Sequence, residues 1–167
     1  MKTLLNHFVD LCLLRKGPQD MPFSPQLLVV VTLLNVLVGV VMIVDVRTGV
    51  VTSLGESLFD AGLMLVVLYF ALQSQNRLAR FNQAAISLMG SGLLLGLLAL
   101  PLISWSRNPD SVLAGLSLLV LIVWSMVVMG HILRHTFEIR LFIGIGLAFI
   151  YTLLSWNLTL ILFPVVN

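Results

Sequence analysis

The sequence predicts an all-α fold, a polytopic bundle of five transmembrane helices with a short amphipathic helix at its N-terminus. Of its 167 residues, 59% are hydrophobic and only 10% are charged, whereas a soluble domain carries about 25% charged residues. The mean hydropathy is +1.10. A soluble chain of this size exposes too much surface to hide so many apolar side chains, so this composition fits a lipid bilayer.

Five stretches are long enough to cross a bilayer as helices, which takes roughly 20 mainly apolar residues each. Membrane-spanning β-strands would be shorter and would alternate in polarity. The connections are short, as is usual between antiparallel helices. We expect an N-terminal segment over residues 1–22 and a membrane domain over 23–167, with spans at about 26–44, 54–73, 84–105, 111–133 and 141–163.

The first 16 residues predict a helix that lies in the membrane interface on the cytoplasmic side. The segment is too polar to cross the bilayer and has one apolar side, which is typical of interfacial helices. Packing of this helix under the bundle is an equally good alternative. Its apolar side carries Leu4, Leu5, Phe8, Leu11 and Cys12.

Several residues predict where the spans begin and end. Ser24, followed by a proline, is typical of a helix N-cap, and Ser53 with Glu56 fits a capping box for the second span. Asp110 is the expected N-cap of the fourth span. Pro101 is expected to kink or shorten the third.

Basic residues predict the orientation. One side of the five-span topology holds seven lysines and arginines and the other holds two. The positive-inside rule then places the N-terminus in the cytoplasm and the C-terminus outside, and we expect a bacterial inner (plasma) membrane. The seven are Lys2, Arg15, Lys16, Arg77, Arg80, Arg134 and Arg140, and the two are Arg47 and Arg107.

Few strongly polar residues fall well inside the predicted spans, and two of them stand out: Asn35 near the middle of the first and Asp60 two turns inside the second. A charge at the bilayer centre costs about 2.5 to 3.5 kcal/mol, so such residues are functional candidates. One interpretation is a pair that binds a proton or a cation. In the other, Asn35 joins two helices, and Asp60 stays hydrated near the outer surface beside Arg47.

His131, His135 and Glu138 follow one another at i, i+4 and i+7 on one helix face. Two histidines at i, i+4 can share a metal ion, as in zincins, so metal or haem binding is one hypothesis, with Glu138 or His7 as third ligand. The general-base glutamate of the zincin motif is not present between them. Histidines are also common at membrane interfaces for ordinary reasons.

Small residues predict close helix contacts. Gly92 and Gly96 form a GxxxG pair in the third span, and such faces let helix backbones approach closely in lipid. They serve either packing inside the bundle or docking of another membrane protein or a second copy. The fifth span has a similar face, with Ile145 expected on its lipid side; this face contains Gly144, Ala148, Thr152 and Ser155.

The sequence contains no motif of a catalytic centre. It has neither a nucleophile elbow nor a glycine-rich phosphate loop, so we expect no enzymatic activity, no catalytic residue and no cofactor. A basic stripe of the kind that binds nucleic acid is also missing. The expected partners are the lipid bilayer and other membrane proteins.

The whole-chain layout resembles the Yip family of small five-span membrane proteins. The shared features are a short N-terminal segment, five spans, very short loops and an outward C-terminus, and residues 124–140 (WSMVVMGHILRHTFEIR) are similar to the late region of that family. The resemblance implies an accessory, scaffold or trafficking-type role without enzymatic activity. The alternatives are a small ion-coupled transporter using Asn35 and Asp60, or a metal- or haem-handling subunit using His131 and His135.

Overall fold

The computed structural model describes residues 2–44, 49–106 and 112–164, and throughout these ranges the regular structure is helical. Five of the helices are long and apolar enough to cross a membrane, so the predicted fold class is confirmed and the chain is a multi-pass membrane protein. The elements are α1 (Lys2–Cys12), η1 (Pro18–Asp20), α2 (Pro25–Ile43), α3 (Val50–Ser74), η2 (Leu78–Arg80), α4 (Phe81–Ser106), α5 (Val112–Phe137) and α6 (Leu141–Leu162).

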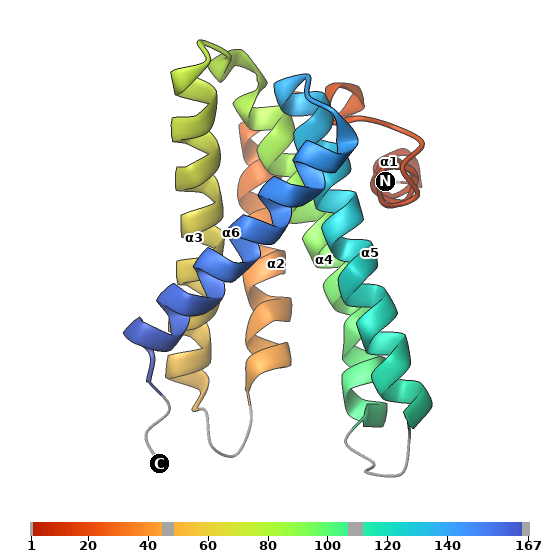
Figure 1. The fold of residues 1–167 in the computed structure, drawn as a ribbon, viewed down its shortest axis with the longest axis vertical. Coiled ribbons are helices and arrows are strands. Elements are labelled where there is room, and N and C mark those ends of the chain that lie inside the picture. Colours follow the sequence, from red (N-terminus) through yellow and green to blue (C-terminus); the bar gives the residue numbers. More distant parts are fainter. Residues whose placement is uncertain (1, 45–48, 107–111, 165–167) are drawn as a thin grey trace.

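Helix α4 is the centre of the bundle, because it packs against α2, α3, α5 and α1. Helix α6 packs along α5 and then crosses α3 diagonally, as Figure 1 shows. The α3–α4 and α5–α6 connections lie at the same end of the molecule. We call this the basic end, because Arg77, Arg80, Arg134 and Arg140 lie in or next to those two connections.

The core lies in the half of the bundle next to the basic end. There, α4 is buried without a break from Ala84 to Ser91, and α5 from Gly130 to Leu133. Small side chains fill much of this stretch of α4, so the neighbouring helices can approach its backbone. Towards the other end only Leu95 and Ala99 of α4 are buried.

Glycines mark the closest helix contacts, as the sequence predicts. A Cβ atom on Gly92 would lie 2.9 Å from the Asn35 amide nitrogen, and one on Gly96 would lie 2.9 Å from Val38 Cγ1. The GxxxG pair therefore receives α2. Both residues face the inside of the bundle rather than an open docking surface.

The small-residue face of α6 packs on α5 at its N-terminal part. Gly144 and Ala148 are buried, and a Cβ on Gly144 would meet the carbonyl oxygen of Gly130. Thr152 is exposed and donates its hydroxyl to the Ala148 carbonyl oxygen (2.9 Å). Ile145 does not lie on the lipid side as expected, because its backbone and side chain are the atoms closest to Gly130.

Helix α1 runs across the direction of the spans and is seen end-on in Figure 1, beside α4 and α5. Phe8 rests on Gly90, and the Trp124 indole N–H donates to the Cys12 carbonyl oxygen (3.1 Å). One side of α1 is therefore packed on the bundle, the alternative interpretation of this helix. A second apolar stripe stays exposed and is available to lipid; it consists of Leu5, Val9 and Leu13.

One predicted helix end is confirmed, at Ser24, and two features differ from the sequence prediction, at Ser53 and at Pro101. Ser24 is the N-cap of α2, with its hydroxyl oxygen accepting from the Leu27 N–H (3.2 Å). The capping box at Ser53 is wrong, since α3 begins at Val50 and Ser53 is a buried helical residue that donates to the Gly49 carbonyl. Helix α4 continues through Pro101 to Ser106, so the proline does not shorten it. Arg47, Arg107 and Asp110 lie outside the described residues.

Candidate functional site

Asp60 lies close to the middle of α3 rather than near its end. Ten residues separate it from Val50, which corresponds to about 15 Å along a helix. The expectation of a hydrated, interfacial carboxylate depended on a helix that begins at Leu54. With the additional turn, Asp60 lies near the middle of the length of α3, and charges at the middle of a membrane span are rare.

Two hydroxyl groups of α6 hold the Asp60 carboxylate. Ser155 Oγ donates to Asp60 Oδ1 (2.5 Å), and the Tyr151 hydroxyl lies 3.2 Å both from Oδ1 and from the Asp60 carbonyl oxygen. Ser155 is buried, whereas Asp60 itself is exposed on the surface of the bundle. We call these three residues the carboxylate site.

Among the described residues no cation contacts the carboxylate site, and Arg47, the neighbour expected from the sequence, lies outside them. None of the ion pairs among the described residues includes Asp60, and the groups that contact its carboxylate are neutral hydroxyls. A hydrogen bond from a neutral donor offsets only part of the desolvation of a carboxylate. Within the described part of the chain, the charge of Asp60 is therefore not neutralised.

Asn35 does not join this site. Its amide donates to the Met89 carbonyl oxygen (3.0 Å), which links the middle of α2 to α4. Gly92, one turn further along α4, leaves room for the amide. The structure thus separates the two polar residues that the sequence suggests as a pair, and Asn35 serves as a contact between helices.

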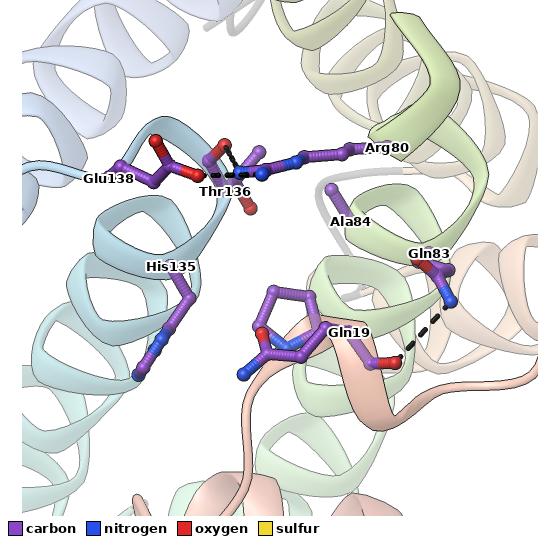
Figure 2. A pocket seen from close by; sticks show the side chains of 8 residues that line it. Gln19, Arg80, Gln83, Ala84, His135, Thr136 and Glu138 are labelled. Atoms are coloured by element: carbon purple, nitrogen blue, oxygen red, sulfur yellow. Dashed lines mark hydrogen bonds and ion pairs between the residues drawn. The ribbon is translucent and has the colours of Figure 1, made fainter. Parts of the chain in front are cut away.

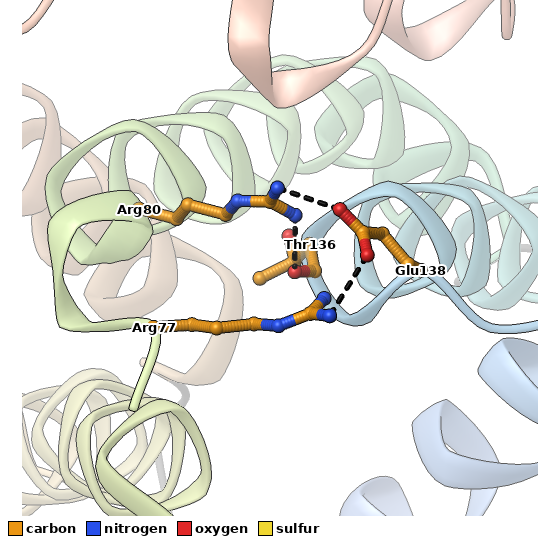
Figure 3. A network of polar contacts seen from close by, with 4 residues as sticks. All are labelled: Arg77, Arg80, Thr136 and Glu138. Atoms are coloured by element: carbon orange, nitrogen blue, oxygen red, sulfur yellow. Dashed lines mark hydrogen bonds and ion pairs between the residues drawn. The ribbon is translucent and has the colours of Figure 1, made fainter. Parts of the chain in front are cut away.

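A second polar cluster joins the two connections at the basic end. Glu138 Oε2 accepts from Arg77 Nη2 (2.8 Å), and its Oε1 accepts from Arg80 Nη2 (2.6 Å), as Figure 3 shows. Arg80 Nη1 also donates to the Thr136 carbonyl oxygen (3.3 Å). We call Arg77, Arg80 and Glu138 the clasp, because they tie the α3–α4 connection to the end of α5.

Backbone geometry positions the clasp. Glu138 follows the last residue of α5 with φ 58°, and the Ile139 N–H donates to the Arg134 carbonyl oxygen. Asn76 has φ 56° after α3, and the Arg77 N–H donates to the Leu72 carbonyl oxygen. Both are Schellman ends, which usually place glycine at the left-handed position. A glutamate there costs about 1 to 2 kcal/mol of strain, and in this position its carboxylate is held by the two arginines.

The two guanidinium groups act on the charge of Glu138. The hydrogen bond from Arg80, followed by that from Arg77, holds the pKa of this carboxyl below its usual range. Glu138 is therefore ionised throughout the neutral range, and the clasp is formed there.

A cavity of about 300 Å³ lies beside the clasp, between η1, the start of α4 and the end of α5. Figure 2 shows the polar side chains around it. Gln83 is engaged in holding η1, since its amide nitrogen donates to the Met21 carbonyl oxygen (2.8 Å). The cavity is lined by Pro18, Gln19, Arg80, Gln83, Ala84, His135, Thr136 and Glu138.

The three predicted metal ligands do not form one site. The His131 and His135 rings touch edge to face, with centroids 4.6 Å apart, and His131 Nε2 lies 3.0 Å from the Lys16 carbonyl oxygen. Glu138 binds two arginines instead of joining them. Across residues 2–44, 49–106 and 112–164, no three His, Cys, Asp or Glu side chains are placed to hold a metal ion.

Sequence reasoning missed the partners in both polar clusters. Tyr151 is the only one of the chain's two tyrosines that lies at the middle of a span, which was a usable signal for a polar contact. Arg77, Arg80 and Glu138 all fall next to connections that the charge count places on one side of the membrane. Opposite charges on the same side were the signal in the sequence for an ion pair between these connections.

Comparisons with known proteins add no relative. No protein-family model matches the chain, and no curated protein or solved structure matches it either.

Proposed function

We propose that this protein is a non-enzymatic accessory or scaffold protein of a membrane, which binds another membrane protein through the carboxylate site. The observation that carries the proposal is the exposed Asp60 at the middle of α3, which forms no ion pair with any described residue. A carboxylate facing lipid at this level is unfavourable by about 2.5 to 3.5 kcal/mol. Contact with a partner helix removes that penalty.

Charge complementarity defines the partner. A transmembrane helix with a lysine, arginine or histidine near its midpoint would neutralise Asp60, and intramembrane charges usually occur in such pairs. Ser155 and Tyr151 occupy one oxygen of the carboxylate and orient it, while no hydrogen bond to the other oxygen occurs among the described residues. That second oxygen is the acceptor for the partner.

The layout shared with the Yip family supports the same kind of role, because that family's role is non-enzymatic membrane organisation. The distribution of basic residues supports a cytoplasmic N-terminus and an outward C-terminus. Reporter fusions test this orientation: we expect a reporter after Arg77 to be cytoplasmic and one after Asn167 to be outside. A cytoplasmic reporter at the C-terminus would contradict it.

Photo-crosslinking in living cells tests the docking proposal. A photoreactive residue replaces Val67, which is exposed two turns from Asp60 on the same side of α3. We expect a crosslinked membrane protein whose attachment site lies near a basic residue within a span. Asp60→Asn should reduce the product by about tenfold or more, since leaving one member of a buried charge pair alone costs about 2 to 5 kcal/mol.

The controls separate docking from random collision. A photoreactive residue at Val120, exposed on α5, should give no product that depends on Asp60, and Asp60→Glu should retain most of the Val67 product. A Val67 product that Asp60→Asn leaves unchanged would show that the carboxylate does not recruit the partner.

The alternative function is proton or cation transport by Asp60. The two hydroxyls on its carboxylate favour this candidate, because hydroxyls can relay protons or ligate small cations. Purified protein in vesicles with an internal pH dye would then show a flux that Asp60→Asn abolishes. Docking predicts no flux in either protein, so the two functions give different results.

A further inference from the structure

We propose that the cavity beside the clasp binds a phosphate group, with Arg80 and His135 as its principal hydrogen-bond donors. The cavity lies between three elements that are far apart in the sequence, η1, α4 and α5. Its volume of about 300 Å³ is at the small end of ligand sites. It fits a phosphate headgroup and is too small for a nucleotide with its base.

Arg80 has donors left for a ligand. A guanidinium carries five N–H groups, and the structure uses one on Nη1 for the Thr136 carbonyl and one on Nη2 for Glu138. The remaining donors can meet an anion without opening the clasp. Planar guanidinium groups are well matched to phosphate oxygens.

His135 is the second donor. Its ring contacts His131, and in the described part of the chain no hydrogen bond engages either of its nitrogens. His131, in contrast, is occupied by the Lys16 carbonyl oxygen. Figure 2 shows His135 and Gln19 on opposite sides of the same space, so an anion between them would meet an imidazole N–H and an amide.

Charge around the cavity favours an anion. Four arginines lie at this end, against the carboxylates of Glu138 and Asp20. Asp20 is partly satisfied, because its Oδ2 accepts from the Gly17 N–H (3.0 Å). Arg134 and Arg140 line a neighbouring open depression together with Glu138 and the apolar side chains of Ile139, Leu141 and Phe142. The two arginines outnumber the one carboxylate there, and the depression leads from the cavity to an apolar surface that suits an acyl chain.

The phosphate can come from a lipid headgroup or from solution, and both sources share this chemistry. Basic pockets at the ends of transmembrane helices are general sites for phospholipid headgroups. The proposal does not depend on the docking function of Asp60, which lies on other elements.

Binding measurements on the full-length protein in detergent test the inference. The probes are inorganic phosphate and short-chain phosphatidylglycerol, with short-chain phosphatidylcholine for comparison. We expect saturable binding of a phosphate-bearing probe, weakened about tenfold by Arg80→Gln and by His135→Ala, the usual worth of one charge-assisted hydrogen bond. Competition by inorganic phosphate indicates a soluble anion, and binding of phosphatidylglycerol without such competition indicates a headgroup that needs its acyl chains.

A control variant keeps the result interpretable. Arg15→Gln removes an exposed positive charge that lines neither the cavity nor the neighbouring depression, and it should change the affinity less than twofold, within ordinary screening of surface charges. Equal losses in Arg15→Gln and Arg80→Gln, or no binding of any probe, would overturn the proposal.

Discussion

The half of the bundle next to the basic end holds most of the buried core, whereas the other half buries few side chains. Ile86 and Ile132 are completely buried, while towards the other end only Leu95 and Ala99 of α4 are buried. Exposed apolar side chains occur at both ends, since Val51 is 85% exposed and Phe142, beside the basic end, is 86% exposed. Packing within the chain is therefore concentrated at one end, and the exposed apolar surfaces at both ends are left for lipid or a partner.

A related contrast holds between the carboxylates of Glu138 and Asp60. Glu138 lies at the surface and is over-compensated by two guanidinium groups. Asp60 lies at the middle of α3, and its side-chain partners among the described residues are hydroxyls. Surface ion pairs contribute little to the free energy of unfolding, whereas an uncompensated charge within a span is strongly unfavourable. Asp60 is therefore the better indicator of function and Glu138 of architecture.

Substitution of Gly130, in the packed half, should cause the largest loss of stability. A Cβ there would come within 2.8 Å of the Cα of Ile145, so Gly130→Leu must push α6 away from α5. We expect a loss of about 1 to 3 kcal/mol from overpacking, measured as a lower midpoint of thermal unfolding in detergent. Gly115→Leu, on the same helix in open space, should leave the midpoint unchanged. Equal effects of the two would show that α5 and α6 do not pack as described.

The helices and their order could be predicted from the sequence, because long apolar stretches report directly on the bilayer. The start of α3 at Val50 could not be predicted, because Ser53 is a plausible N-cap in the sequence. Only the folded helix shows that the Ser53 hydroxyl donates to the Gly49 carbonyl oxygen. The error of one turn changed the interpretation of Asp60. Local rules place helix ends within a few residues, and here those few residues decide whether Asp60 lies near the end or near the middle of its helix.

The partners of Asp60 could not be predicted for a different reason. Tyr151 and Ser155 are 91 and 95 residues away in the chain. Their contact depends on the diagonal path of α6 across α3 (Figure 1), and sequence periodicity does not specify helix crossing angles. The periodicity did predict which face of α6 is small, and Gly144, Ala148 and Ser155 are buried.

Trp124→Phe should have a moderate effect, confined to α1. The substitution removes the hydrogen bond from the indole to the Cys12 carbonyl and keeps an aromatic ring, so we expect a loss of about 1 kcal/mol. Hydrogen exchange should become faster in residues 4–12 and remain unchanged in α5. Trp156→Phe, on an exposed part of α6, is the matched control. Uniform protection of α1 in both variants would mean that apolar packing alone holds this helix.

Glu138→Gln should have a small, pH-dependent effect. The pKa of Glu138 is lowered in the folded protein, so the clasp stabilises the fold above the unfolded-state pKa of about 4.3. This contribution is lost as the pH falls through the lower folded-state pKa. The difference in unfolding midpoint between wild type and Glu138→Gln should therefore be present at pH 7 and disappear at strongly acidic pH. A constant difference across this range would show that the carboxylate's charge is not what ties the two connections.

Asp60→Asn should have the smallest effect on stability, although it alters the most unusual residue. The amide oxygen of asparagine accepts the hydrogen bonds that Ser155 and Tyr151 now donate to Oδ1, so the contact between α3 and α6 persists. The substitution removes a charge that no cation compensates among the described residues, which offsets any weakening of those bonds. Asn35→Ala provides the comparison, because it breaks a hydrogen bond between α2 and α4 and should cost about 0.6 to 1.7 kcal/mol. We therefore expect the unfolding midpoint of Asp60→Asn to equal or exceed that of the wild type, and that of Asn35→Ala to be lower. If Asp60→Asn instead unfolded at a lower temperature than the wild type, the carboxylate would be a structural element of the bundle. Its exposure would then no longer point to a partner.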